Sequence, residues 1–158
     1  MKSIKDTPYI NSVKEIRTYE FGTFFFFDHL VVSEINEGVV FNWEMAKKVI
    51  NAAFDILGNQ FPIAYISNRI HSYSLVPTDW LKFYKEYKNH LTSYSIVVYR
   101  YSTITNIFLE KMFSDIKIQK FNTIDNAINW SISEKQKLII NELFNLDSKI
   151  QIEDSKIN

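Results

Sequence analysis

The chain has 158 residues with 18 basic and 18 acidic side chains, so its formal net charge is zero. This balance argues against a nucleic-acid-binding protein, which usually carries a basic excess. No apolar run is long enough for a transmembrane helix, and the first residues lack the apolar segment of a signal peptide, so we expect a cytoplasmic protein. The absence of cysteine excludes disulfides, thiolate metal ligands and cysteine nucleophiles.

The first third of the chain has the patterns of antiparallel strands. Residues 13–21 and 23–27 are rich in strand-forming side chains, and Gly22 either separates two strands or lies at a bulge within one strand. A two-residue turn at 28–29 is expected to pair the second of these segments with a strand at 30–35.

The run Phe24–Phe27 must place alternate rings on opposite faces of a sheet. One pair of rings is therefore expected in the core. The other pair needs cover from a helix or from a second copy of the chain, with core burial the favoured of the two. This run is the main indication of a homodimer in the sequence.

Helical and strand patterns alternate from residue 42 onward. Helices are expected after an Asn42 cap up to Gly58, over 78–91, over 103–113 and from a Thr123 cap; strands are expected at 62–67, 94–100 and 116–121. This alternation predicts right-handed crossovers and parallel strands. The expected fold class is α/β, a mixed sheet whose N-terminal antiparallel strands precede a βαβαβα parallel part, with helices packed on the sheet.

The end of the chain differs from the rest. Ser133 and Gln136 make a capping box, and apolar residues recur at loosely helical spacing as far as Leu146. We therefore expect a separate helix followed by a frayed polar tail. The domain interpretation is a single domain over 1–132 and a helical extension over 133–158, which packs on the body or meets a partner.

Two segments resemble a known family. YISNRIHSYSLVP (65–77) reads as a strand followed by a polar loop, and FNTIDNAINWSI (121–132) closes the predicted domain. Together with the element order, they resemble a STAS-like domain, the anti-sigma-factor-antagonist fold, in its small stand-alone bacterial variant. The resemblance covers roughly residues 12–132. It implies a mixed sheet and a mostly non-enzymatic signalling role in which the domain binds a partner protein.

The resemblance also draws attention to serines in the loop. Familiar members carry a phosphorylatable serine there, in a short Asp-Ser-Ser/Thr-Gly-like motif. The loop of this chain offers Ser67, Ser72 and Ser74 but has no Asp-Ser pair and no glycine. Only the location of the loop is carried over, with Ser72 and Ser74 as candidate phosphorylation sites.

The same loop is the main candidate for a ligand or partner site. In open α/β sheets, ligands bind beyond the carboxyl ends of parallel strands, and two such ends are expected at 67–77 and 100–103. The candidate residues are Asn68, Arg69, His71, Ser72, Ser74, Arg100 and Ser102. Two guanidinium groups near a helix N-terminus suit a phosphate or carboxylate. Alternatively, these side chains bond to the backbone and hold the loop in place.

Catalysis is not favoured. Ser72 or Ser74 with His71 and Asp79 has the atom types of a serine hydrolase, but residues so close in sequence rarely form a triad, and no G-x-S-x-G motif is present. No cofactor is predicted.

A metal site is not favoured either, because the spacing of the three histidines does not match a metal motif: His29, His71 and His90. Three carboxylates close in sequence are best explained as solvated surface groups: Glu34, Glu37 and Glu44.

The leading hypothesis is a non-catalytic cytoplasmic module for regulation or protein interaction that uses the rim formed by loop 67–77. The alternative is a small-molecule-binding protein or enzyme that uses this rim for an anionic or lipid-like ligand. That alternative requires an apolar cavity of roughly a few hundred cubic ångströms with Arg69 or Arg100 at its mouth. A third interpretation is a structural homodimer without a ligand.

Overall fold

A computed structural model gives the fold and describes residues 1–99 and 117–157. The helix expected over 103–113 and the candidate residues Arg100 and Ser102 lie outside the described residues. No helix in the described part of the chain is both long enough and apolar enough to cross a membrane.

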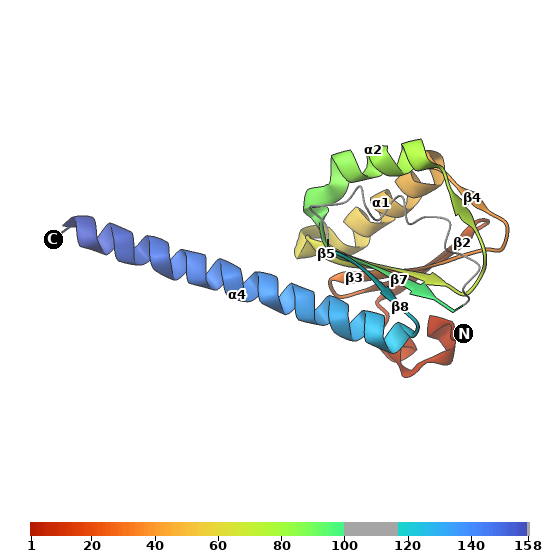
Figure 1. Cartoon of the computed structure of the whole chain (residues 1–158), viewed down its shortest axis with the longest axis horizontal. Helices are drawn as coiled ribbons and strands as arrows, with labels where there is room; N and C mark the ends of the chain where they lie inside the picture. The colour runs from red at the N-terminus through yellow and green to blue at the C-terminus, as the bar shows by residue number, and fades with distance from the viewer. Residues whose placement is uncertain (100–116, 158) are drawn as a thin grey trace.

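Six strands of the described chain form one sheet in the order β1-β2-β3-β5-β7-β8 (Figure 1). They are Glu15–Tyr19 (β1), Gly22–Phe27 (β2), Leu30–Ile35 (β3), Ile63–Arg69 (β5), Leu91–Val98 (β7) and Ile118–Phe121 (β8). The first three strands pair antiparallel and the last four pair parallel. The sheet is therefore mixed, as predicted. A short parallel pair, Val40–Phe41 (β4) and Ser74–Leu75 (β6), lies apart from it.

The turns between the first strands follow local sequence signals. Gly22 opens β2, so the chain forms a hairpin at this point and the alternative of one bulged strand is wrong. Asp28 and His29 form the predicted two-residue turn, with His29 at a φ of 61°.

Helices cover both faces of the sheet (Figure 1). Trp43–Leu57 (α1) and Pro77–Tyr87 (α2) lie on one face; Ile124–Ile157 (α4) and the N-terminal turns Ile4–Asp6 (η1) and Pro8–Ser12 (η2) lie on the other. Two further turns, Gly58–Gln60 (η3) and Lys88–His90 (η4), follow α1 and α2. The caps of α1 are as predicted: the Asn42 side chain accepts a hydrogen bond from the Met45 backbone N–H, and Gly58 ends the helix with a φ of 49°.

The phenylalanine run is buried on both faces. Phe25 and Phe27 pack into a core with Ile124 of α4, whereas Phe24 and Phe26 pack into a second core with Val49 of α1. Both faces of the sheet are covered within one chain, so these rings need no second copy.

The C-terminal segment is a single helix from Ile124 to Ile157. The Thr123 side chain caps its start by accepting a hydrogen bond from the Asn126 backbone N–H (3.2 Å). The predicted break at the Ser133–Gln136 capping box is wrong, and so is the frayed tail after Leu146. Residues 124–138 are anchored on the sheet, and no glycine or proline occurs later in the chain, so no strong helix breaker ends the helix after them.

Candidate functional site

The first residues of the predicted loop extend strand β5. Ser67, Asn68 and Arg69 pair with β7, with Arg69 opposite Val98. Asn68 is only 1% exposed. Its amide donates to the Glu34 carboxylate (2.8 Å), and its carbonyl oxygen accepts a hydrogen bond from the Tyr99 hydroxyl (2.9 Å). Asn68, in β5, therefore joins β3 to the residue that follows β7, from within the fold.

Glu34 is buried, and the expectation of a solvated carboxylate is wrong at this position. Its oxygens accept hydrogen bonds from the Ser3 hydroxyl (2.7 Å) and the Ile4 backbone N–H (2.8 Å), in addition to Asn68. The N-terminal turn η1 folds back over the end of β3 and supplies these donors. This contact spans about thirty residues of sequence, and no local pattern announces it.

Arg69 is directed at its own loop. Its guanidinium donates to the Tyr73 carbonyl oxygen (2.6 Å) and lies over the Tyr73 ring, 4.2 Å from the centroid. The Tyr73 hydroxyl in turn shares a hydrogen bond with the Ser67 hydroxyl (2.7 Å). Arg69 and Tyr73 thus hold the loop against the end of β5.

The exposed part of the rim is the turn His71–Ser74. His71, Ser72 and Ser74 are exposed. The Ser72 backbone N–H donates to the Glu37 carboxylate (2.7 Å), and the His71 ring lies 3.9 Å from the same carboxylate. The structure therefore divides the predicted site into an inner group that stabilises the fold and an outer turn that faces solvent. Arg100, which the sequence places at the same rim as Asn68, Arg69 and His71, lies outside the described residues.

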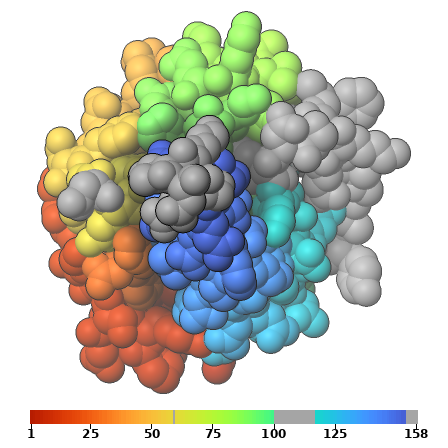
Figure 2. All heavy atoms as spheres, turned by 90° about the vertical axis from the view of Figure 1, so that its left-hand side faces the viewer, coloured from red at the N-terminus to blue at the C-terminus, as the bar shows by residue number. Residues whose placement is uncertain are grey.

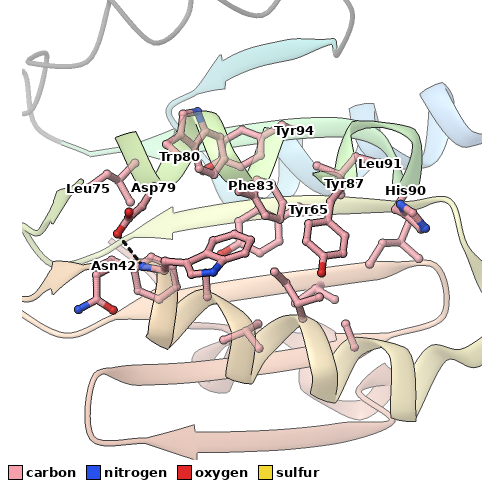
Figure 3. Close-up of a pocket in the computed structure, with 18 of the residues that line it drawn as sticks. Asn42, Tyr65, Leu75, Asp79, Trp80, Phe83, Tyr87, His90, Leu91 and Tyr94 are labelled. Atoms are coloured by element: carbon pink, nitrogen blue, oxygen red, sulfur yellow. Dashed lines mark hydrogen bonds between the residues drawn. The ribbon is translucent and has the colours of Figure 1, made fainter. Parts of the chain in front are cut away.

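The carboxylate of Asp79 has a structural partner. Asp79 lies in the first turn of α2 and accepts a hydrogen bond from the Trp43 backbone N–H (2.8 Å) at the start of α1 (Figure 3). This contact ties the two helix starts together. Within residues 1–99 and 117–157, no cluster of His, Asp or Glu has the composition of a metal site.

The structure shows a cavity that the sequence did not reveal. A space of about 90 Å³ lies between α1, α2 and the sheet (Figure 3). We call it the aromatic cavity; the aromatic side chains in its wall are Phe41, Trp43, Phe54, Phe61, Tyr65, Trp80, Phe83, Tyr87, His90 and Tyr94. Its wall is made by elements distant in sequence, which explains why a local pattern could not predict it.

Helix α2 is the least firmly packed wall of this cavity. None of its residues is fully buried. It meets the sheet through partly exposed rings, with Trp80 packed edge-on against Tyr94 at a centroid distance of 5.1 Å and stacked on Phe83 at 5.1 Å. Its start is held more firmly, because the Val76 backbone N–H donates to the Phe41 carbonyl oxygen (3.2 Å). An element with few fully buried contacts opens at low free energy.

Few polar groups line the aromatic cavity. Burial raises the pKa of Tyr65 and of Tyr94 well above the ordinary tyrosine value, so both phenols stay neutral. The His90 ring packs edge-on against Phe54 at 5.5 Å, and its Nδ1 atom is buried without a hydrogen-bond partner among the described residues. Buried polar atoms are normally paired, so Nδ1 is a natural contact for a bound molecule.

A second cavity of about 340 Å³ lies on the opposite face, beneath α4. It is larger, but several of its polar side chains already have partners within the protein. The Lys135 ammonium donates to the Pro62 carbonyl oxygen (2.8 Å), and the Tyr9 hydroxyl donates to Asp125 (3.0 Å). The aromatic cavity, with its unpaired Nδ1 atom, is therefore the better candidate for a ligand site.

Comparison with known proteins supports the fold. No family model matches the chain, and no curated protein matches it. The chain is similar to a crystal structure of an uncharacterized protein of the DUF3478 family from Shewanella loihica PV-4, described as having a SpoIIAA-like fold. The TM-score is 0.50 at 12% identity, over 74% of this chain and 90% of the other. The fold is thus SpoIIAA-like, which confirms the resemblance to a STAS-like domain at the level of architecture.

Proposed function

We propose that the protein is a non-catalytic binding module that holds a small, mostly apolar molecule in the aromatic cavity. The observation that carries this proposal is a cavity walled by aromatic rings and closed by α2, a helix without a fully buried residue. Ligand sites are typically apolar, with a few well-placed polar groups. The Nδ1 atom of His90, which has no hydrogen-bond partner among the described residues, is such a group.

The lining restricts the chemistry of the ligand. No lysine or arginine is among the described lining residues, and the carboxylate of Asp79 is engaged by Trp43. The alternative drawn from the sequence is an anionic or lipid-like ligand at the loop rim, whereas the lining of the aromatic cavity favours an uncharged ligand. At about 90 Å³ the cavity is smaller than the roughly 150 Å³ cavity known to hold benzene, so it suits a short alkyl chain or another small apolar group. A larger molecule requires outward movement of α2.

Cavity-filling variants test this proposal. The probe is N-phenyl-1-naphthylamine, a neutral apolar dye whose fluorescence rises on transfer from water to an apolar site. Ala53 and Ala46 both line the cavity. We expect Ala53→Phe and Ala46→Phe each to weaken dye binding roughly tenfold or more, because the added ring occupies the cavity.

The matched control is Asn51→Phe, which adds the same ring to the exposed face of α1. It should bind the dye as the unaltered chain does, with circular dichroism confirming that every variant folds. Because the dye is larger than the cavity, its binding also requires outward movement of α2. Dye binding that survives in both folded filling variants would contradict the proposal, as would a failure of the unaltered chain to bind either the dye or xenon, an apolar probe small enough for the cavity.

A second candidate is a regulatory protein-interaction module that acts through the turn His71–Ser74. It is favoured by the exposure of His71, Ser72 and Ser74 and by the SpoIIAA-like fold. The cavity variants separate the two candidates, because a partner that contacts only this turn is expected to bind Ala53→Phe and the unaltered chain equally well.

A further inference from the structure

The last part of α4 projects away from the body of the molecule (Figure 1). Figure 2 looks along this helix from its C-terminal end and shows it standing in front of the body. We call residues 139–153 the α4 extension. Its large apolar side chains are exposed. Four of them are Ile139 (45%), Leu143 (57%), Leu146 (56%) and Ile150 (56%); Ile140, Phe144 and Ile152 are exposed as well but do not share their spacing.

These four side chains follow one another at intervals of four, three and four residues. This is the spacing of the d, a, d and a positions of a coiled-coil heptad, and Ile132 lies at the d position one heptad earlier. They therefore form a single apolar seam along the helix, which is the surface that a second helix covers in a coiled coil.

The composition of the α4 extension shows that it needs such cover. Isolated helices of about 15 residues are marginal in water even when rich in alanine. The α4 extension contains no alanine and several weak helix formers: Asn141, Asn145, Asp147 and Ser148. A helix of this composition gains most of its stability from packing its apolar face.

We propose that the α4 extensions of two copies of this chain pair as an antiparallel two-stranded coiled coil. This inference goes beyond the proposed ligand-binding function and does not depend on it. In the register that we infer, Ile139 lies opposite Ile150 of the second copy and Leu143 lies opposite Leu146 of the second copy. The two-fold axis repeats both pairs, so every central layer is apolar. The polar seam positions Gln136 and Glu153 then meet at each end.

Charge complementarity at the centre of the seam favours this arrangement. Glu142 and Lys149 occupy the g positions beside the seam, and g positions of antiparallel helices face each other. Glu142 of each copy therefore lies beside Lys149 of the other. In a parallel pair, Glu142 would instead face Asp147, and Glu153 would meet its own copy within the seam, which places like charges together. Toward the ends of the overlap, Lys135 would lie beside Lys156 of the other copy in the antiparallel pair, although Lys135 already donates to the Pro62 carbonyl oxygen of its own body. In a parallel pair, Lys149 would lie beside Asp154. The choice of direction therefore rests on the central Glu142–Lys149 pairs and on keeping Glu153 away from its own copy within the seam.

The antiparallel arrangement also keeps the two bodies apart. The register places residue 157 of one helix level with residue 132 of the other. At about 1.5 Å per residue the overlap is roughly 37 Å long, so the two bodies lie at opposite ends of the coiled coil. The free end of each helix then lies level with Ile132, which lines the second cavity of the other copy.

The first test measures the mass of the full-length protein in solution by size-exclusion chromatography with light scattering. We expect a dimer. Leu143→Asp should raise the dimer dissociation constant roughly 100-fold, because it places a carboxylate in a central layer. The control is Phe144→Asp: Phe144 is more exposed, at 68%, but it lies off the seam, so this variant should remain dimeric.

A monomeric unaltered chain at high protein concentration would overturn the proposal. So would a tetramer, or equal dissociation of Leu143→Asp and Phe144→Asp. Near-UV circular dichroism, which reports on the packed aromatic rings of the body, is compared between each variant and the unaltered chain. It checks that the substitutions leave the sheet domain folded.

A second test determines the direction of the helices. In the antiparallel pair, Glu142→Lys should weaken the dimer because the introduced ammonium would face Lys149 of the other copy, and the added change Lys149→Glu should restore it. In a parallel pair, Glu142→Lys would strengthen the dimer by facing Asp147.

Because the chain has no cysteine, introduced cysteines report on contacts without interference. We expect an oxidised mixture of the Leu143→Cys and Leu146→Cys chains to form disulfide-linked heterodimers. Efficient linkage of either variant with itself would overturn the antiparallel register.

Discussion

Gly22 marks a point at which the sheet has no room for a side chain. A Cβ atom at this position would lie 2.7 Å from the Glu34 carbonyl oxygen and 2.9 Å from the Ile35 Cα atom. Both are backbone atoms of β3, so neither can move without disturbing the pairing of the strands. We expect Gly22→Ala to lower the free energy of unfolding by about 1–3 kcal/mol, measured by urea denaturation.

Gly38→Asn is the matched control for Gly22→Ala. Gly38 has a φ of 74° and open space around it, and asparagine tolerates this left-handed conformation better than most residues. We expect Gly38→Asn to lower the free energy of unfolding by less than about 1 kcal/mol. Equal losses at the two glycines would show that the close approach at Gly22 relaxes easily.

Individual side chains were the hardest feature to predict from the sequence. The polar cluster after PIAYI indicated a binding loop, yet Asn68 and Arg69 bond within the fold. Whether these two side chains face a ligand or bond within the fold depends on the positions of Lys2, Glu34 and Tyr73, which are set by tertiary structure. Only the exposed part of the cluster, at residues 71–74, retains the character expected of an interaction surface.

Helix α4 is attached to the edge of the sheet by a buried carboxylate. Glu134 is 6% exposed and forms hydrogen bonds with Lys117, just before β8, and with Lys137 in the next turn of the helix. The Lys117 ammonium, and then that of Lys137, hold the pKa of Glu134 below its ordinary value, against the opposing effect of burial. This contact fixes the orientation from which the α4 extension leaves the body.

The contact makes stability depend on pH. Because the pKa of Glu134 is lower in the folded state than in the unfolded state, its contribution is complete above the unfolded value of about 4.3 and is lost as the pH falls through the folded value. We expect Glu134→Gln to lower the free energy of unfolding by about 0.5–1 kcal/mol at pH 7, since both lysines are largely exposed. The difference from the unaltered chain should shrink below about pH 4.

Denaturation curves at several pH values measure this difference. The control is Glu20→Gln, which changes an exposed glutamate. A difference between Glu134→Gln and the unaltered chain that stays constant from neutral to acidic pH would show that the lysine contacts contribute nothing to folding.

Elements with a strong local signal were predicted well. Within the described residues, the alternation of β-strands and amphipathic helices, the Asn42 cap and the Thr123 cap were visible in the sequence and are confirmed. The boundary at Ser133 failed because a capping motif is a local preference, whereas the packing of residues 124–138 on the sheet carries the helix through it. The aromatic cavity escaped prediction because its wall is assembled from several elements.

At the scale of the whole molecule, the body and the α4 extension have different physical requirements. The body buries both faces of its sheet within one chain and carries the candidate ligand cavity. The α4 extension leaves its apolar seam in solvent, and this seam is the surface for which we propose a second copy as the partner. The sequence places a domain boundary at residue 132, but contacts with the body continue beyond it, through Glu134 and Lys135.

Truncation shows where the body ends. A chain ending at residue 138 keeps Glu134, Lys135 and the half-buried Leu138, whereas a chain ending at residue 132 loses all three. In urea denaturation at concentrations too low for association, the 138-residue chain should match the full chain within about 0.5 kcal/mol. The 132-residue chain should lose about 1–3 kcal/mol with the charged hydrogen bonds of Glu134 and Lys135. Equal stability of the two truncated chains would instead support a boundary at residue 132, and strong destabilisation of the 138-residue chain would show that the α4 extension packs on its own body.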